Sequence, residues 1–241
     1  MNTINYKTAI LIASIFGIAL LISSCTKLDN YDPPSAKLSG HLVYKGETLG
    51  VEYNAVPYQI YQDGFGKTGP ISATFAPDGS YSTLLFDGNY KLLIPNNQGP
   101  FRWRFTPTGN PDTLAIAIKG DQVLDLEVTP YYMIRTPQLT VSEGKVSGTF
   151  KLEKIITDAN AKTIESVAIY INKGQFVSNN GNERIAMTSI NGSAVTDLNN
   201  ISLSVLIPAM VPAQNSVYAR VGVKITGVED RLYSSVQKLN F

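Results

Sequence analysis

Hydrophobic and polar residues alternate along most of this chain. The clearest segments, which carry an aliphatic residue at every second position, are 114–118, 124–128, 201–207 and 217–225. A period of two sends successive side chains to opposite faces, so it predicts half-buried β-strands, with Arg220 on the polar face of the last one. No stretch of ten or more residues carries apolar residues at the spacings of three and four typical of a helix. The predicted fold class is all-β.

Pairs of Asp or Asn followed by Gly separate the predicted strands. They are Asp63-Gly64, Asp78-Gly79, Asp87-Gly88, Asn180-Gly181 and Asn191-Gly192. Such pairs supply the positive φ of tight hairpins, and turns spaced ~8–12 residues apart are typical of β-sandwiches. We place a domain boundary near Pro130, because segments 36–130 and 131–241 each approach the ~100 residues of an immunoglobulin-sized sandwich. The boundary has no flexible linker, so we expect closely coupled domains.

The N-terminus has the features of an export signal. Lys7 precedes an apolar run from Ala9 to Ile22, which is shorter than the ~20 residues that span a bilayer. Ile22-Ser23-Ser24-Cys25 resembles a bacterial lipobox. We therefore predict a signal peptide at 1–24, lipidation of Cys25 and a polar, proline-containing tether at 25–35. An ordinary cleaved signal with a chance cysteine nearby is the alternative.

Charge and composition exclude several functions. The chain has 20 Lys and Arg against 19 Asp and Glu, and nucleic acid binding requires a clustered excess of cations. Cys25 is the single cysteine and His41 the single histidine. A disulfide framework, a Cys/His zinc site and a histidine-based triad therefore lack parts or depend on His41 alone. We predict no cofactor, no metal site and no nucleic acid partner.

Two motifs resemble known sandwich domains. The doubled Gly-x-Tyr pattern, Gly79-Ser80-Tyr81 and Gly88-Asn89-Tyr90, resembles transthyretin-like (carboxypeptidase-regulatory-like) domains. In that pattern the glycine makes the turn and the tyrosine enters the next strand with its ring inward and its hydroxyl near backbone. The segment 218–223 and Tyr233 resemble the last strands of a fibronectin type III or immunoglobulin-like domain, with Tyr218 as a candidate tyrosine corner.

The mature chain as a whole resembles a family of two-domain Bacteroidetes surface lipoproteins. The resemblance rests on segments 30–34, 38–40, the Gly-x-Tyr pair, 99–101 and 127–131. Members are typically encoded beside SusC/SusD-type transporters, which are TonB-dependent channels with a lipoprotein lid. The resemblance implies an accessory subunit of a glycan or peptide uptake complex at the outer membrane, and Lys27, Asp29 and Asp32 loosely resemble the family's surface-export stretch.

Candidate contact residues lie in the segment Phe101-Arg102-Trp103-Arg104-Phe105. In a strand, its three aromatic rings share one face and its arginines the other. Exposed rings would stack on sugars, whereas buried rings would belong to the sandwich core. Tyr131 and Tyr132 follow at the boundary, where one ring is expected to pack between the domains and the other to reach solvent. The predicted ligand or partner contacts are Trp103, Phe101, Arg102, Arg104 and Tyr132.

The function predicted from the sequence is non-catalytic. We expect an outer-membrane, lipid-anchored protein that faces the cell exterior and captures glycan or oligopeptide for a SusC/SusD-type transporter. A structural subunit that docks on the channel or lid without binding ligand is one alternative. The other is a glycoside hydrolase, which would need two carboxylates ~5–9.5 Å apart, and the acidic residues form no recognisable motif of that kind.

Overall fold

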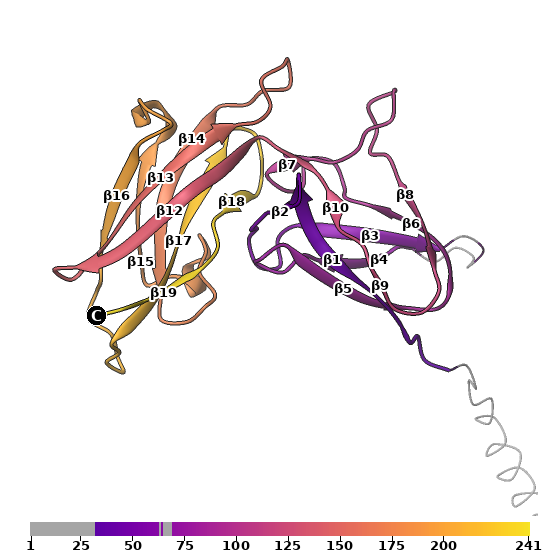
Figure 1. Ribbon diagram of the computed structural model, residues 1–241, viewed down its shortest axis with the longest axis horizontal. Helices are drawn as coiled ribbons and strands as arrows, with labels where there is room; N and C mark the ends of the chain where they lie inside the picture. The colour runs from indigo at the N-terminus through magenta and orange to yellow at the C-terminus, as the bar shows by residue number, and fades with distance from the viewer. Residues whose placement is uncertain (1–31, 63, 65–68) are drawn as a thin grey trace, which may run out of the picture. The chain divides into compact units, whose positions relative to one another are not determined.

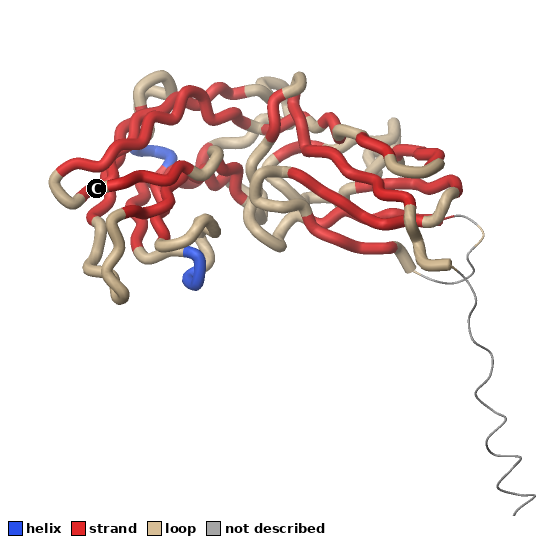
Figure 2. The backbone as a smooth tube through the Cα atoms, turned by 60° about the horizontal axis from the view of Figure 1, so that its bottom comes forward, coloured by secondary structure: helices blue, strands red, loops and turns tan. Residues whose placement is uncertain are grey.

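The computed structural model describes residues 32–62, 64 and 69–241. The predicted signal peptide, Cys25, most of the tether and Asp63 therefore lie outside the described residues. The regular secondary structure of the described chain is almost entirely strand, apart from two short 3₁₀ turns, which confirms the predicted all-β class (Figures 1 and 2). Within the part that the structure describes, no helix is long and apolar enough to span a membrane.

The first sandwich consists of two sheets and a short ribbon. One sheet is arranged around β1 (Ala36–Tyr44) and also contains β2 (Glu47–Thr48), β5 (Ser80–Leu85), β9 (Gln122–Val123) and β10 (Leu126–Glu127). The other has the order β4 (Ile71–Thr74), β3 (Pro57–Gln62), β6 (Gly88–Leu93) and β8 (Leu114–Ile118). The ribbon pairs β7 (Phe101–Arg102) with β11 (Thr129–Pro130).

The second sandwich also has two sheets. One has the order β12 (Tyr132–Ser142), β13 (Lys145–Lys154) and β16 (Ile201–Leu206). The other contains β15 (Ala186–Asn191), β14 (Ile164–Asn172), β17 (Ser216–Ile225), β18 (Arg231–Tyr233) and β19 (Gln237–Asn240). The segments predicted as strands at 114–118, 201–207 and 217–225 are strands in the structure, whereas 124–128 contains only the short β10.

The two Gly-x-Tyr motifs behave as predicted. Gly79 has a φ of +81°, and a Cβ there would lie 2.2 Å from the carbonyl oxygen of Leu49, so this turn requires glycine. The buried Tyr81 hydroxyl donates to the carbonyl oxygen of Leu124 at 2.7 Å, and the buried Tyr90 hydroxyl donates to that of Phe86 at 2.9 Å. Burial raises the pKa of both hydroxyls, so each tyrosine brings its polar atom into the sandwich already paired.

None of the four described Asp-Gly and Asn-Gly pairs forms the predicted tight hairpin. The strands on either side of Gly79, Gly88 and Gly192 belong to different sheets, and Gly181 lies in a long loop between β14 and β15. Asn180-Gly181 and Asn191-Gly192 begin the 3₁₀ turns η2 (Gly181–Glu183) and η3 (Gly192–Ala194), and both asparagines have negative φ. The Asn180 side chain accepts a hydrogen bond from the backbone N–H of Asn182. Asparagine therefore caps the turn here and does not enter the left-handed region that an Asn-Gly hairpin uses.

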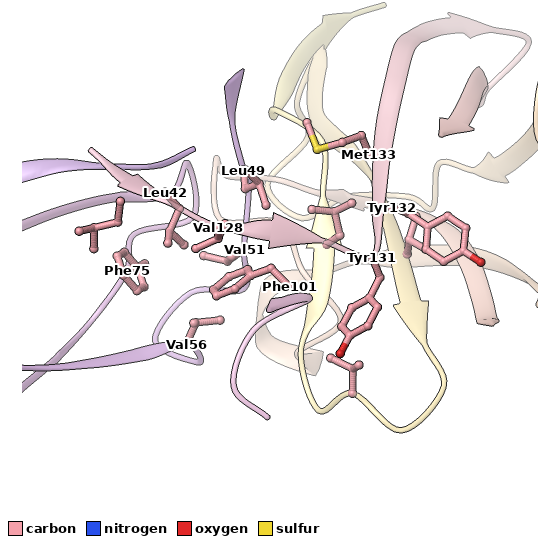
Figure 3. Packing of buried hydrophobic residues seen from close by; sticks show 14 of the residues in the cluster. Leu42, Leu49, Val51, Val56, Phe75, Phe101, Val128, Tyr131, Tyr132 and Met133 are labelled. Carbon is pink, nitrogen blue, oxygen red and sulfur yellow. The ribbon is translucent and has the colours of Figure 1, made fainter. Parts of the chain in front are cut away.

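Most buried hydrophobic residues of the two sandwiches form one continuous cluster. Around Pro130 this cluster includes Phe101, Val128, Tyr131, Tyr132 and Met133 (Figure 3). The prediction that one tyrosine ring reaches solvent is wrong, because Tyr131 and Tyr132 are both buried. The two rings point away from the chain in different directions (Figure 3), and both are buried.

A backbone bridge joins the two sandwiches. The N–H of Tyr233 in β18 donates to the carbonyl oxygen of Gly50 at 3.0 Å, and the two residues form an isolated antiparallel bridge. Asp230 strengthens the contact by accepting from the N–H of Gly99 at 2.8 Å. A Cβ on Gly50 would lie 2.6 Å from the Tyr233 carbonyl oxygen, so the approach is close enough to require glycine.

Arg220 lies beneath this bridge, where the sequence pattern predicted an exposed residue. Its side chain is 1% exposed, its Nη1 donates to the carbonyl oxygen of Val51 at 3.3 Å, and its guanidinium carbon lies 3.8 Å from the centre of the Tyr233 ring. The prediction failed because the second face of this sheet is also covered, by a small cluster that contains Tyr170, Val177 and Tyr233. Burial lowers the pKa of Arg220 to about 10, which leaves it charged at neutral pH.

Gly50→Ala tests the bridge. The added methyl group cannot fit against the Tyr233 carbonyl, and we expect it to reduce the free energy of unfolding by about 1–3 kcal/mol, as overpacking does elsewhere. Urea or thermal denaturation measures the loss. Gly181→Ala is the matched control, because a Cβ there meets no atom within 4 Å. Equal stability of the two variants would contradict the assignment.

Candidate functional site

The structure separates the five side chains of the segment Phe101–Phe105. The strand β7 ends at Arg102, so the predicted alternation does not continue to Phe105. Phe101 and Trp103 are buried, and Trp103, 7% exposed, donates from Nε1 to the carbonyl oxygen of Asp112 at 2.8 Å. Phe105 is 36% exposed. The expectation that Phe101 and Trp103 contact ligand is therefore corrected: their rings belong to the core.

Both arginines of this segment interact with side chains that lie close to them in the sequence. The half-buried Arg102 places its guanidinium carbon 4.8 Å from the centre of the Phe105 ring. Arg104 is exposed, and its Nη2 lies 3.7 Å from a carboxylate oxygen of Asp112. Both arginines remain at the surface, but the three aromatic rings of the segment do not form the predicted stripe on the opposite face of a strand.

The prediction that Tyr132 contacts a ligand or partner is also corrected. Its ring is buried, and its hydroxyl donates to the carbonyl oxygen of Lys162 at 2.9 Å. Burial raises the pKa of this hydroxyl. The residue therefore supports the junction from inside and offers no surface to a ligand.

The structure instead contains a groove with a volume of about 1060 Å³. The segments that line it are 46–50, Tyr53, 76–78, part of β12, Gln175-Phe176 and 232–236. These come from both sandwiches and meet at the bridge between Gly50 and Tyr233. The volume lies slightly above the ~300–1,000 Å³ of small-molecule sites.

Two exposed aromatic rings stand in this groove. Tyr53 is 51% exposed and Phe176 is 44% exposed, and their ring centres are 5.1 Å apart in an edge-to-face arrangement. Large aromatic side chains usually bury most of their surface, so two exposed rings in contact within a concave surface indicate a binding site.

Tyr233 holds the loops that carry both rings. Its N–H is bonded to Gly50, three residues before Tyr53. Its hydroxyl accepts a hydrogen bond from the N–H of Asn179 at 2.9 Å, three residues after Phe176. Burial raises the pKa of this hydroxyl. One buried residue thus fixes the positions of the two exposed rings relative to each other, through its backbone N–H on one side and its hydroxyl on the other.

The carboxylates that line the groove are already engaged. Glu47 pairs with Arg135, which also binds Glu153 at 2.7 Å. The Asp78 carboxylate accepts a hydrogen bond from the Ser80 N–H at 3.0 Å and another from the Ser80 hydroxyl at 2.7 Å. Partial burial alone would raise the pKa of Asp78, but the two hydrogen bonds outweigh burial, so the pKa is lowered. Both groups present hydrogen-bond acceptors to a ligand. Among the described residues, no group of His, Cys, Asp and Glu is arranged to hold a metal ion.

Sequence reasoning missed Tyr53 and Phe176. Each is a single aromatic residue in an irregular loop, Tyr53 beside Asn54 and Phe176 shortly after Gly174. Large apolar residues within turn-rich polar segments are a weak signal that could have identified them, because such residues gain little burial there. Their proximity depends on contacts across more than a hundred residues and does not appear in any local pattern.

The fold and the groove define a protein of two joined β-sandwich domains with an aromatic-lined surface cleft. The family description "Protein of unknown function (DUF3823) N-terminal domain" matches residues 36–129, and "Domain of unknown function (DUF3823_C)" matches 132–238. A DUF3823 family structure from Parabacteroides merdae is 32% identical with a TM-score of 0.74, covering 87% of this chain and 100% of that one. The chain belongs to the DUF3823 family.

Two further structures show the same fold. A DUF3823 family protein from Bacteroides ovatus is 30% identical with a TM-score of 0.74, covering 86% of this chain and 99% of that one. A Bacteroides uniformis structure, described as a proposed carbohydrate binding protein, is 19% identical with a TM-score of 0.68, covering 87% and 100%. No curated protein matches the chain.

Trp103→Ala distinguishes a core ring from a contact ring. Because the indole is buried and hydrogen-bonded, we expect the substitution to lower the free energy of unfolding by about 3–5 kcal/mol. Phe105→Ala, two residues away at an exposed position, is the control and should cost far less. Thermal denaturation measures both, and a Trp103 variant as stable as the wild type would refute the burial.

Proposed function

We propose that this protein captures carbohydrate at the bacterial cell surface and transforms nothing. The observation that carries the proposal is the pair of exposed rings, Tyr53 and Phe176, in a groove whose rim offers polar groups. Pyranose rings have flat apolar faces that pack on aromatic rings and hydroxyl edges that need hydrogen-bond partners. The described carbohydrate role of the Bacteroides uniformis protein of the same fold is consistent with this function.

The groove favours a neutral ligand. Thr48, Gln175 and Ser235 are exposed in its lining, together with Glu47 and Asp78. Among the described residues that line the groove there is no Lys or Arg. Glu47 is already paired with Arg135, so an acidic glycan would meet the carboxylate of Asp78 without a cation in the groove lining to bind it, which is unfavourable. A neutral glycan matches the hydroxyl, amide and carboxylate groups as donors and acceptors.

The cellular role follows from the N-terminal sequence and the family resemblance. We propose that Cys25 carries lipid, that the protein is anchored to the outer membrane facing outward, and that it serves a SusC/SusD-type transporter as an accessory subunit. Capture near the channel would raise the local ligand concentration, because a tethered site works at high effective concentration. The two sandwiches need no catalytic group for this task.

Tyr53→Ala and Phe176→Ala test the groove. Each should weaken binding of a neutral polysaccharide about tenfold or more, because an exposed aromatic anchor contributes most of the contact with a sugar face. Calorimetry and affinity electrophoresis against panels of polysaccharides and peptides measure the effect. The melting temperature should change little, because both rings are exposed.

Phe105→Ala serves as the control, since it removes an exposed ring outside the groove. Unchanged affinity in both groove variants would show that the ligand binds elsewhere. Binding of peptides and not of polysaccharides would replace the proposed ligand.

Cys25→Ser tests the anchor. Lipid chains contribute ~0.8 kcal/mol per buried methylene, so their loss should move the protein from the membrane fraction to the soluble fraction. Immunoblotting of fractionated cells measures this, and retention of the variant in the membrane would contradict lipidation. Affinity purification of the wild-type protein from the same membranes should recover a channel and its lid; recovery of neither would remove the transporter from the proposal.

A further inference from the structure

A second hollow lies on the other side of Tyr53. It has a volume of about 580 Å³ and lies over the outer face of β1 and β5. Tyr53 and Ala76 line both this hollow and the groove. The exposed ring of Tyr53 therefore divides two adjoining depressions and is accessible to a molecule that occupies either one.

The second hollow is lined by a ladder of polar side chains, with the exposed Lys37 at one end and the exposed Val123 beside Ser39. In the antiparallel pairing of β1 with β5, Ser39 lies opposite Ser82 and His41 lies opposite Ser80. These positions alternate with the buried Leu38, so the polar side chains share the outer face of the sheet. Hydroxyl and imidazole groups on one face of two paired strands provide repeated donors and acceptors, spaced along each strand at about 6.6 Å, twice the rise per residue.

The two depressions together exceed a small-molecule site. The groove alone, at about 1060 Å³, lies slightly above the ~300–1,000 Å³ range, and the second hollow adds about 580 Å³. A monosaccharide would leave most of this surface unoccupied. A chain of sugars could pass from Phe176, over Tyr53, and along the ladder of Ser39 and Ser82.

We propose that the groove and the second hollow form one continuous site for an unbranched neutral oligosaccharide, with Tyr53 beneath the middle of the chain. This inference rests on the proposed carbohydrate function and adds the form of the ligand: an extended chain, recognised along its length. Tyr53 stacks with a central sugar, Phe176 supports one flank, and the serine ladder binds the hydroxyl rim of the other flank. Affinity then increases with chain length until both depressions are filled.

Calorimetry with oligosaccharides of defined length tests the proposal. The probes are cello-, xylo-, manno- and malto-oligosaccharides from disaccharide to octasaccharide, with the purified protein. In the series that binds, affinity should rise about tenfold or more between the disaccharide and the hexasaccharide, which corresponds to about 1.4 kcal/mol of added contact, and then level off. Equal affinity at all lengths would overturn the extended site.

Ser82→Tyr provides the matched test on the protein side. Ser82 is exposed and its side chain faces the second hollow, so a bulky ring should block that hollow without entering the core. All lengths should then bind with the affinity of the shortest chain. Ser202→Tyr, at an exposed position of β16, should leave the dependence on length intact. Retention of the length dependence in Ser82→Tyr would also overturn the proposal.

The outcomes separate the two proposals. If neither the oligosaccharides nor the polysaccharide panel binds, the carbohydrate function itself fails. If short and long chains bind equally and Tyr53→Ala still abolishes binding, the groove function stands and the extended site is refuted.

Discussion

The contact between the Tyr233 backbone and Gly50 is the constraint on which the candidate site depends. The bond joins β18 of the second sandwich to a loop of the first, and no side chain at position 50 would allow the same approach. The Tyr233 hydroxyl binds the backbone of Asn179, so the same residue also positions the loop of Phe176. Without this residue the two exposed rings would belong to independent loops, and a shared surface for a ligand would not be preformed.

The buried charge of Arg220 belongs to this junction. Removing a cation from water is costly. The Val51 carbonyl, the face of the Tyr233 ring and the negative charges of Glu52 and Glu183 offset this cost only in part, because burial still lowers the pKa of Arg220. Its Nε has no hydrogen-bond partner among the described residues. Such a group contributes to a specific arrangement more than to stability, because few alternative packings satisfy a buried guanidinium. The cation under Tyr233 thus specifies one way of joining the two sandwiches.

The sequence predicted the strands well because their signal is local. Alternation in 114–118, 201–207 and 217–225 was sufficient to place three strands, and the Gly-x-Tyr pairs predicted both the turns and the inward tyrosines. The prediction of exposure failed where other residues cover the strand face that carries polar side chains in the sequence pattern. Arg220 is such a case: the ring of Tyr233 covers it, and its hydrogen-bond partner, the carbonyl oxygen of Val51, lies some 170 positions earlier in the chain.

The sequence predicted the type of site, an aromatic surface, but not the residues that form it. An aromatic ligand surface was expected, but it was placed at Phe101, Trp103 and Tyr132, which are core residues. Large aromatic rings on one face of a short strand usually pack into the hydrophobic core, because burying them is more favourable than leaving them exposed to a ligand. Tyr53 and Phe176 carry no repeating pattern, and only the packing around Tyr233 brings them together.

Hydrogen exchange measured by mass spectrometry, with and without a bound neutral oligosaccharide, tests the central claim most directly. If Tyr233 holds one preformed carbohydrate site, exchange should slow on binding in the peptides that cover 47–53, 174–180 and 232–236, and remain unchanged around 106–111. Protection confined to 106–111, or to one sandwich alone, would contradict the account.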